Sequence, residues 1–312
     1  MVIVVKAEKT EHKIRSNTMR VSQSIITRTL LQSLNRNREN LNDLQTSIAT
    51  GREVRQSSND PVQFARASRF RNSIKQNDQY LRNINGANGW LDTTSSTLEN
   101  LYSSIMRAKE ISIQGADEAN SAESREAMAN QIDEILEEVI SLANSTYLDK
   151  FIFSGTDTRR ENETFTYDNA SVTYNGNENG ITRRIAENQR ANINIHGGQL
   201  IDSGMFESLI NLRDALSDDD TEGIQNSIES LEDTSKSLLA LSSGIGSVKN
   251  RIKMVEERLE TANVNIASYL SQTVDADLAE TITQYNAEEM AYHAALQTTS
   301  KALQLNLLDF LR

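Results

Sequence analysis

Apolar side chains recur at alternating steps of three and four residues over long stretches of this 312-residue chain. The longest such run begins at Ile245 and ends at Tyr269. This spacing places the side chains on one face of an α-helix and is typical of helices that pack nearly parallel. The only proline, Pro61, is compatible with a chain built mostly of long helices. Near the N-terminus the same spacing joins Leu30, Leu34, Leu41, Leu44 and Ile48, with Asn37 at the polar heptad position.

Glycine and capping signals separate these helical stretches. Gly51 is expected to end the first long helix. After it come Asn59, Asp60 and Pro61, where Asp60 can cap the next helix and Pro61 can be its first residue. We predict helices over about 62–85, over 91–108 and over 128–146, because each carries a helical apolar stripe.

Composition changes between residues 155 and 204, which hold six of the 13 glycines. In TFTYD, SVTYNG and ANINIHG the apolar period falls toward two, which is the period of a strand. Asn175-Gly176 and Asn179-Gly180 are turn dipeptides that would separate these strands. We predict a small, exposed β insertion here, and a return to helix from about Met205.

The sequence therefore predicts a mainly α protein, an elongated bundle of long antiparallel helices. Both termini would form a helical coiled-coil domain, and a small β insertion domain would interrupt the rod. The expected segments are an N-terminal extension (1–18), the first half of the terminal coiled coil (19–60), the first half of a helical rod (61–154), the insertion (155–204), the second half of the rod (205–273) and the second half of the coiled coil (274–312).

The C-terminal helix raises the question of what covers its apolar side chains. Its heptad seam includes polar residues, so a two-helix coil would be thin and would leave apolar surface uncovered. One interpretation is an intramolecular coil that only holds the termini together; we favour contacts between copies. The predicted interface residues are the five N-terminal apolar residues named above together with Ile282, Leu296, Leu303, Leu307, Leu308, Phe310 and Leu311.

The residue types needed for catalysis or metal binding are scarce. The net charge of −12 argues against a protein that binds nucleic acid, and no stretch approaches the roughly 18 apolar residues of a membrane span. The chain has no cysteine, and its three histidines have no ligand spacing. Asp218, Asp219 and Asp220 are interpreted as a helix cap, because they lack the pattern of a calcium loop. We expect no enzyme activity, no cofactor, no metal and no small-molecule substrate.

Several segments of the sequence resemble the bacterial flagellin superfamily. They are MRVSQSIITRTLLQSLNRNRENLNDLQTSIATGREVRQSSNDP, ANGWLDTTSSTLENLYSSIMRAKEISIQGAD, GSVKNRIKMVEERLE and the stretch from Asp275 to Arg312. Within it, MRVS at residue 19, FIFSGTDT at 151–158 and the ending LNLLDFLR resemble the family of hook-associated protein three, at the hook-filament junction, more than flagellin itself. The leading residues 1–18 resemble nothing in that superfamily.

The resemblance implies a secreted structural protein of the bacterial flagellum, exported through the flagellar type III channel. Such proteins join hook to filament and polymerise into a ring through their terminal helices. The implied partners are other copies of the chain, hook-associated protein one, flagellin and a flagellar export chaperone. Two alternatives remain open: flagellin, the filament subunit, and a secreted coiled-coil effector or adhesin.

Overall fold

The structure is a computed structural model that describes residues 2–54, 56, 58, 60–159, 163–168 and 170–310; for residues 2–24, 26 and 302–310 it describes the backbone only. The chain forms two compact units. One consists of Met1–Asn72 with Ile266–Arg312, and the other of Ser73–Asn265. The segment boundaries expected from the sequence stay predictions.

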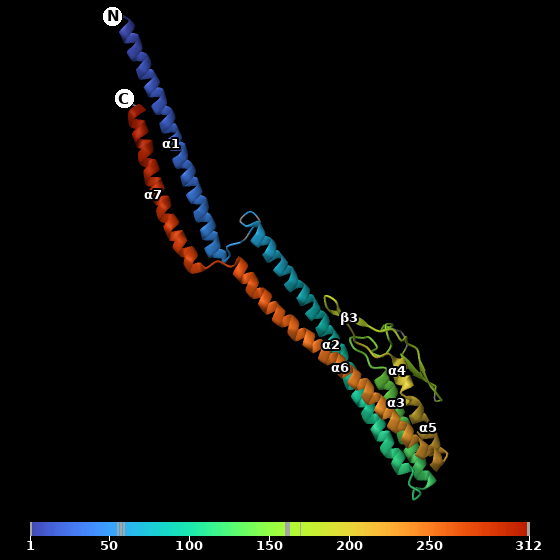
Figure 1. Cartoon of the computed structure of the whole chain (residues 1–312). Helices are drawn as coiled ribbons and strands as arrows, with labels where there is room; N and C mark the ends of the chain where they lie inside the picture. The colour runs from blue at the N-terminus through green and yellow to red at the C-terminus, as the bar shows by residue number, and fades with distance from the viewer. Residues whose placement is uncertain are drawn as a thin grey trace. The chain divides into compact units, whose positions relative to one another are not determined.

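Five long helices make up most of the described chain (Figure 1). They are α1 (Val2–Thr50), α2 (Pro61–Gly115), α3 (Ala122–Ala143), α6 (Thr221–Val274) and α7 (Leu278–Phe310). The mainly α fold class predicted from the apolar periodicity is confirmed. Helix α1 begins well before Met19, although the first 18 residues show no helical period of their own.

Helix α2 corrects one prediction, because residues 61–115 form one helix and not two. The expected break lay in the Gly86–Gly89 segment, and both glycines are helical. A Cβ on Gly89 would lie 2.2 Å from the Tyr147 hydroxyl. Tyr147 in turn packs edge-on against Trp90, with the ring centroids 6.0 Å apart. Gly89 therefore makes room for an aromatic side chain and does not end the helix.

The insertion contains two antiparallel hairpins. Strand β1 (Phe165–Tyr167) pairs with β2 (Val172–Tyr174), and β3 (Thr182–Ala186) pairs with β4 (Gln189–Asn192). The Asn175-Gly176 and Asn179-Gly180 dipeptides were expected to separate strands, and both lie in the connection between β2 and β3. The first hairpin turns at Asp168, whose carboxylate accepts hydrogen bonds from the backbone N–H groups of Ala170 and Ser171.

The insertion is less exposed than predicted. Phe165 of β1 and Ile185 of β3 are fully or almost fully buried. Two short elements follow, α4 (Gly197–Asp202) and α5 (Met205–Ser217). Gly197 and Gly198 are the first residues of α4. The hairpins thus contribute to the hydrophobic core of unit Ser73–Asn265.

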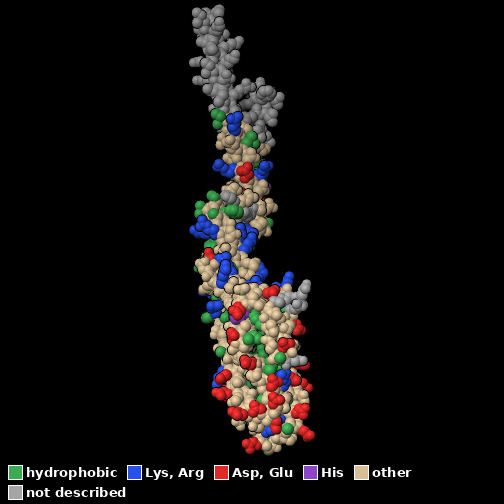
Figure 2. All heavy atoms as spheres, turned by 90° about the vertical axis from the view of Figure 1, so that its right-hand side faces the viewer, with side chains coloured by type: hydrophobic (Ala, Val, Ile, Leu, Met, Phe, Trp, Pro, Cys, Tyr) green, Lys and Arg blue, Asp and Glu red, His purple; other side chains and the backbone are tan. Residues whose placement is uncertain are grey.

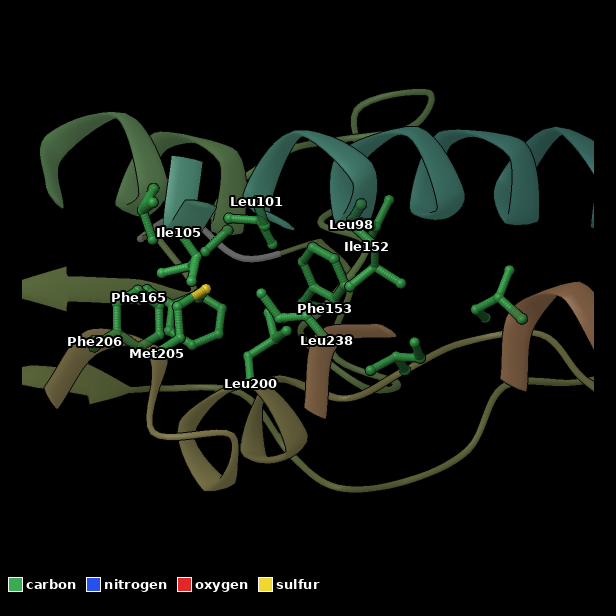
Figure 3. Packing of buried hydrophobic residues seen from close by; sticks show 14 of the residues in the cluster. Leu98, Leu101, Ile105, Ile152, Phe153, Phe165, Leu200, Met205, Phe206 and Leu238 are labelled. Carbon is green, nitrogen blue, oxygen red and sulfur yellow. The ribbon is translucent and has the colours of Figure 1, made fainter. Parts of the chain in front are cut away.

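Figure 3 shows that core, where side chains from α2, β1, α4, α5, α6 and the segment at Phe153 point toward one another. Phe165 lies between Tyr174 and Phe206, with ring centroids 5.3 Å from each. Burying one such aliphatic or aromatic side chain contributes about 1.5–3 kcal/mol. The labelled residues are Leu98, Leu101, Ile105, Ile152, Phe153, Phe165, Leu200, Met205, Phe206 and Leu238.

A buried arginine closes one end of this unit. The Arg125 Nε donates to the Gly115 carbonyl oxygen at 2.9 Å, and its Nη2 donates to the Asp117 carbonyl oxygen at 3.1 Å. Its Nη1 forms an ion pair with Asp219, in the turn between α5 and α6. Asp219 has a φ of +59°, while Asp220 accepts a hydrogen bond from the Glu222 N–H, as an N-cap does. One side chain therefore joins the end of α2, the start of α3 and the α5–α6 turn.

Candidate assembly surfaces of the terminal helices

Helices α1 and α7 pack against each other as an antiparallel pair (Figure 1). The side of α1 that faces α7 follows the heptad spacing read from the sequence. Its half-buried residues are Thr27, Leu30, Leu34, Asn37, Leu41, Leu44 and Ile48. The five leucine and isoleucine residues among these were predicted as interface residues between copies, and within one molecule they are already partly covered by α7.

The side of α7 that faces α1 is polar or small. Thr281 and Thr299 are its buried residues, and Tyr285, Glu288 and Ala295 are half-buried. The Glu288 carboxylate accepts a hydrogen bond of 3.1 Å from the Asn40 side chain of α1. The Thr299 hydroxyl is buried and has no hydrogen-bond partner among the described residues. This contact therefore buries few apolar atoms from the α7 side.

Three large aliphatic residues of α7 lie instead on an outward face. Leu278, Ile282 and Leu296 are 48%, 45% and 39% exposed. On a helix of 3.6 residues per turn these three lie within about 40° of one another and roughly 70° from the inner face. We call them the α7 outer stripe. Tyr285 and Tyr292 are half-buried and belong to the inner face, on the side of it that is nearer to the stripe.

The remaining predicted interface residues lie outside what the structure describes in side-chain detail. Only the backbone of Leu303, Leu307, Leu308 and Phe310 is described, as part of α7, and Leu311 is not described at all. Asn59, predicted in the helix connection, is likewise not described.

The two connections between the helices are joined to each other. Helix α1 ends at Thr50, and Gly51 follows with a φ of +67°, a conformation that favours glycine. Its carbonyl oxygen accepts from the Ala276 N–H at 2.9 Å, and the Glu53 N–H donates to the Val274 carbonyl oxygen at 2.8 Å. Sequence reasoning missed this pairing, because short backbone contacts leave no periodic signal.

Helix caps fix where the next helices begin. The Asp60 Oδ1 accepts from the Val62 and Gln63 N–H groups, both at 2.9 Å, and Pro61 is the first residue of α2. Asp277 caps α7 in the same way, accepting from Ala279 at 2.9 Å. Each cap is worth about 1 kcal/mol. The start of α2 and the start of α7 are therefore each determined by a capping residue next to it in the sequence.

The described residues offer no alternative site for chemistry. They contain no group of three or more His, Asp or Glu side chains placed to hold a metal ion. Over the same residues, no helix has the length and hydropathy of a membrane-spanning segment. His293 is an exposed neighbour of Tyr292, whereas His196, at the start of α4, has a buried Nδ1. His12 lies where side chains are not described.

Comparison with known proteins places the chain in a family. Residues 21–158 match the bacterial flagellin N-terminal helical region, and residues 228–311 match the bacterial flagellin C-terminal helical region. Together the two regions cover more than half of the chain. The chain belongs to the bacterial flagellin family. The match begins at residue 21, close to the expected start of the family-like sequence at Met19.

Members of the flagellin family with two different roles are similar to the chain. A flagellin from Halalkalibacterium halodurans is 19% identical over 85% of this chain and 90% of its own length. Flagellar hook-associated protein 3 from Salmonella typhimurium is 24% identical over 59% of this chain and 57% of its own length. The solved structure of the flagellar junction protein FlgL from Legionella pneumophila has a TM-score of 0.56 and 14% identity, and the match covers 69% of this chain and all of that one. The last comparison shows a common fold.

Proposed function

We propose that the chain is a structural adaptor at the hook-filament junction of the bacterial flagellum, where copies assemble into a ring through their terminal helices. The observation that carries this proposal is the fold. The match to the flagellar junction protein FlgL from Legionella pneumophila covers all of that chain and 69% of this one. Similarity to hook-associated protein 3 supports it independently. As a flagellar component, the protein would act outside the cell.

The α7 outer stripe supports assembly between copies. Leu278, Ile282 and Leu296 form an apolar face on a helix whose inner face is already occupied by α1. Exposed apolar stripes of this kind mark interaction surfaces. In a ring, the stripe would be covered by terminal helices of neighbouring copies, and Leu303, Leu307, Leu308, Phe310 and Leu311 would extend the same contact. Gly51, Asn59, Asp60 and Pro61 would set the direction of the helices at their connection.

Hook-associated protein one and flagellin would contact opposite sides of the ring, and an export chaperone would hold α7 before assembly. These partners follow from the role proposed for the chain. No cofactor or catalytic residue enters the mechanism, because the work done is the mechanical joining of two helical tubes.

A gene deletion tests the proposal. Cells that lack the chain should carry hooks without filaments and should release flagellin into the medium. Electron microscopy with an antibody against unit Ser73–Asn265 should label one band where hook meets filament in the parent strain. Labelling along the whole filament, or normal filaments in the deletion strain, would contradict the junction role.

Flagellin itself is the second candidate, because the flagellin from Halalkalibacterium halodurans matches over 85% of the chain. A filament subunit would be the most abundant protein of sheared flagella, whereas a junction ring would be present in a few copies per flagellum. Quantitative mass spectrometry of sheared flagella separates the two roles.

A further inference from the structure

The β3–β4 hairpin carries three arginines and lies against segments of α2 and α6 that also carry arginine. The hairpin lies against α2, since the Asn83 side chain donates to the Arg184 carbonyl oxygen at 2.8 Å. It also lies against α6, where Arg258 donates to the Gln189 side chain at 3.2 Å. Arg251 precedes Arg258 by two helical turns and therefore lies on the same face of α6. We call the following set the arginine face: Arg82, Arg183, Arg184, Arg190, Arg251 and Arg258.

The arginine face contains an unfavourable pair. Arg184 and Arg190 lie directly opposite each other across the two strands. Like charges in this position destabilise a hairpin. Arg184 is partly compensated, because its guanidinium donates to the Glu187 carbonyl oxygen and lies 5.6 Å from the centroid of the Tyr80 ring. For Arg183 and Arg190, no carboxylate of the described residues lies within ion-pair distance.

The opposite charge is concentrated at one end of the same unit. Residues 109–138 and 207–236, from the end of α2 through α3 and from α5 into α6, hold 18 acidic and four basic side chains. We call these two ranges the acidic end. Figure 2 shows its Asp and Glu side chains gathered at one end of the unit. All four basic residues of the acidic end are paired with carboxylates inside it, as the contacts of Lys109, Arg125, Arg213 and Lys236 show.

One molecule cannot bring the two charged regions together. Helix α2 is continuous from Tyr80, beside the hairpin, to Gly115 at the acidic end. At 1.5 Å per residue these two points are about 50 Å apart. Helix α3 runs back from the level of Gly115, so that Glu138, the acidic residue nearest to the hairpin on α3, is still separated from it by roughly 30 Å. The two regions therefore do not neutralise each other within one molecule.

We propose that the arginine face of one copy binds the acidic end of a second copy that is displaced lengthwise along the rod. The proposal rests on the self-assembly put forward above and adds the surface that sets the offset between neighbours. The argument for a second copy is charge complementarity within a single chain. Neighbours without an offset would place acidic end beside acidic end, which is repulsive, whereas a lengthwise offset of roughly 30–50 Å replaces that repulsion with attraction. Because the two surfaces differ, the contact is heterologous, and the same contact can be repeated from one copy to the next.

Zero-length cross-linking tests this contact in the assembled flagellum. The variant Arg183→Lys/Arg190→Lys keeps both charges and supplies amines that a carbodiimide couples only to carboxylates in direct contact. We expect mass spectrometry to find the new amine at position 183 or 190 joined to carboxylates of the acidic end, a link that one molecule cannot make over a separation of roughly 30 Å or more. The matched control, Arg183→Gln/Arg190→Gln, should lose these links.

Charge reversal provides the second measurement. Arg183→Glu/Arg190→Glu removes the two proposed ion pairs with the acidic end of the neighbouring copy. Each exposed pair changes the binding constant by a factor of up to about five, so incorporation into flagella should fall several-fold. Reversing Glu134 and Glu138 of α3 to arginine in the same chain should restore a substantial part of it, because opposite charges meet again. Incorporation that is unchanged by the arginine reversal would overturn the proposal.

Other outcomes separate this inference from the proposed function. Cross-links from the introduced amines to a different flagellar protein, or none at all in a chain that is present in flagella, would overturn the copy-to-copy contact alone. Absence of the unsubstituted chain from flagella would overturn the proposed function itself.

Discussion

The interior of unit Ser73–Asn265 and the contact between α1 and α7 are built from different side chains. In the first, Leu98, Leu101 and Phe153 are almost completely buried among other apolar residues. In the second, leucines of α1 are half-buried, and they meet threonine, tyrosine and glutamate side chains of α7. Burial stabilises roughly in proportion to the apolar area removed from water. The difference supports the proposal that the terminal pair makes further contacts with other copies, whereas unit Ser73–Asn265 has a core of its own.

The largest effect should come from the interior. Leu101→Ala is expected to lower the free energy of unfolding of unit Ser73–Asn265 by about 2–5 kcal/mol, because it leaves a cavity at a fully buried site. Urea denaturation followed by circular dichroism measures it. The matched control is Leu239→Ala on α6, at a side chain that is 60% exposed, where we expect about 0.5 kcal/mol or less. Equal effects at the two sites would contradict the described core.

Arg125→Ala should have the next largest effect and lower the free energy of unfolding of unit Ser73–Asn265 by about 3 kcal/mol. The substitution leaves the Gly115 and Asp117 carbonyl oxygens without their donor and removes the ion pair with Asp219. Asp219→Asn, which keeps the shape of the partner, should cost much less, since that side chain is half exposed. Hydrogen exchange should increase at the two turns that Arg125 joins, and unchanged exchange there would refute the role of Arg125.

Leu41→Ala in α1 should lower the unfolding free energy of the terminal helices by only about 1 kcal/mol, because the Leu41 side chain is half-buried. Its effect should appear in a transition of the terminal helices that is separate from unfolding of unit Ser73–Asn265. Native-state hydrogen exchange measures both. A loss as large as that of Leu101→Ala would mean that the terminal pair has an interior of its own.

A smaller effect is expected from pH at the first hairpin. Hydrogen bonds from the Ser171 and Ala170 backbone N–H groups hold the pKa of Asp168 below its usual value of 3.8. A carboxylate with a lowered pKa in the folded protein stabilises it at pH values above the unfolded pKa, and the contribution is lost as the pH falls through the folded pKa. The amide resonances of Ala170 and Ser171 should therefore titrate with a midpoint below 3.8. Asp168→Asn should abolish that titration.

The helical parts of the fold were predictable because their signals are local and periodic. The heptad spacing from Leu30 to Ile48 appears in the structure as the half-buried side of α1. The same spacing in α7 predicted one seam, yet Ile282 and Leu296 lie outside while Thr281 and Ala295 lie inside. A pattern of period 3.5 cannot distinguish a face that packs within the chain from a neighbouring face that is left for another molecule.

Other features depended on contacts between distant residues. Separate helices were predicted on either side of residues 86–90, but Gly89 is helical and makes room for Tyr147, which is far along the sequence. The same holds for the burial of Phe165 and for the three contacts of Arg125. The arginine face could not be predicted from the sequence either, because its members come from α2, from the β3–β4 hairpin and from α6.

The most direct measurement concerns the α7 outer stripe. Purified Ile282→Asp/Leu296→Asp protein and unsubstituted protein would each be added to isolated hooks whose ends carry hook-associated protein one. Binding would be followed by electron microscopy. Gln297→Asp, at an exposed polar neighbour, serves as the matched control. We predict that the double variant unfolds like the parent, within about 0.5 kcal/mol, but fails to bind, whereas the control binds. Normal binding of the double variant would contradict the claim that neighbouring copies cover this stripe.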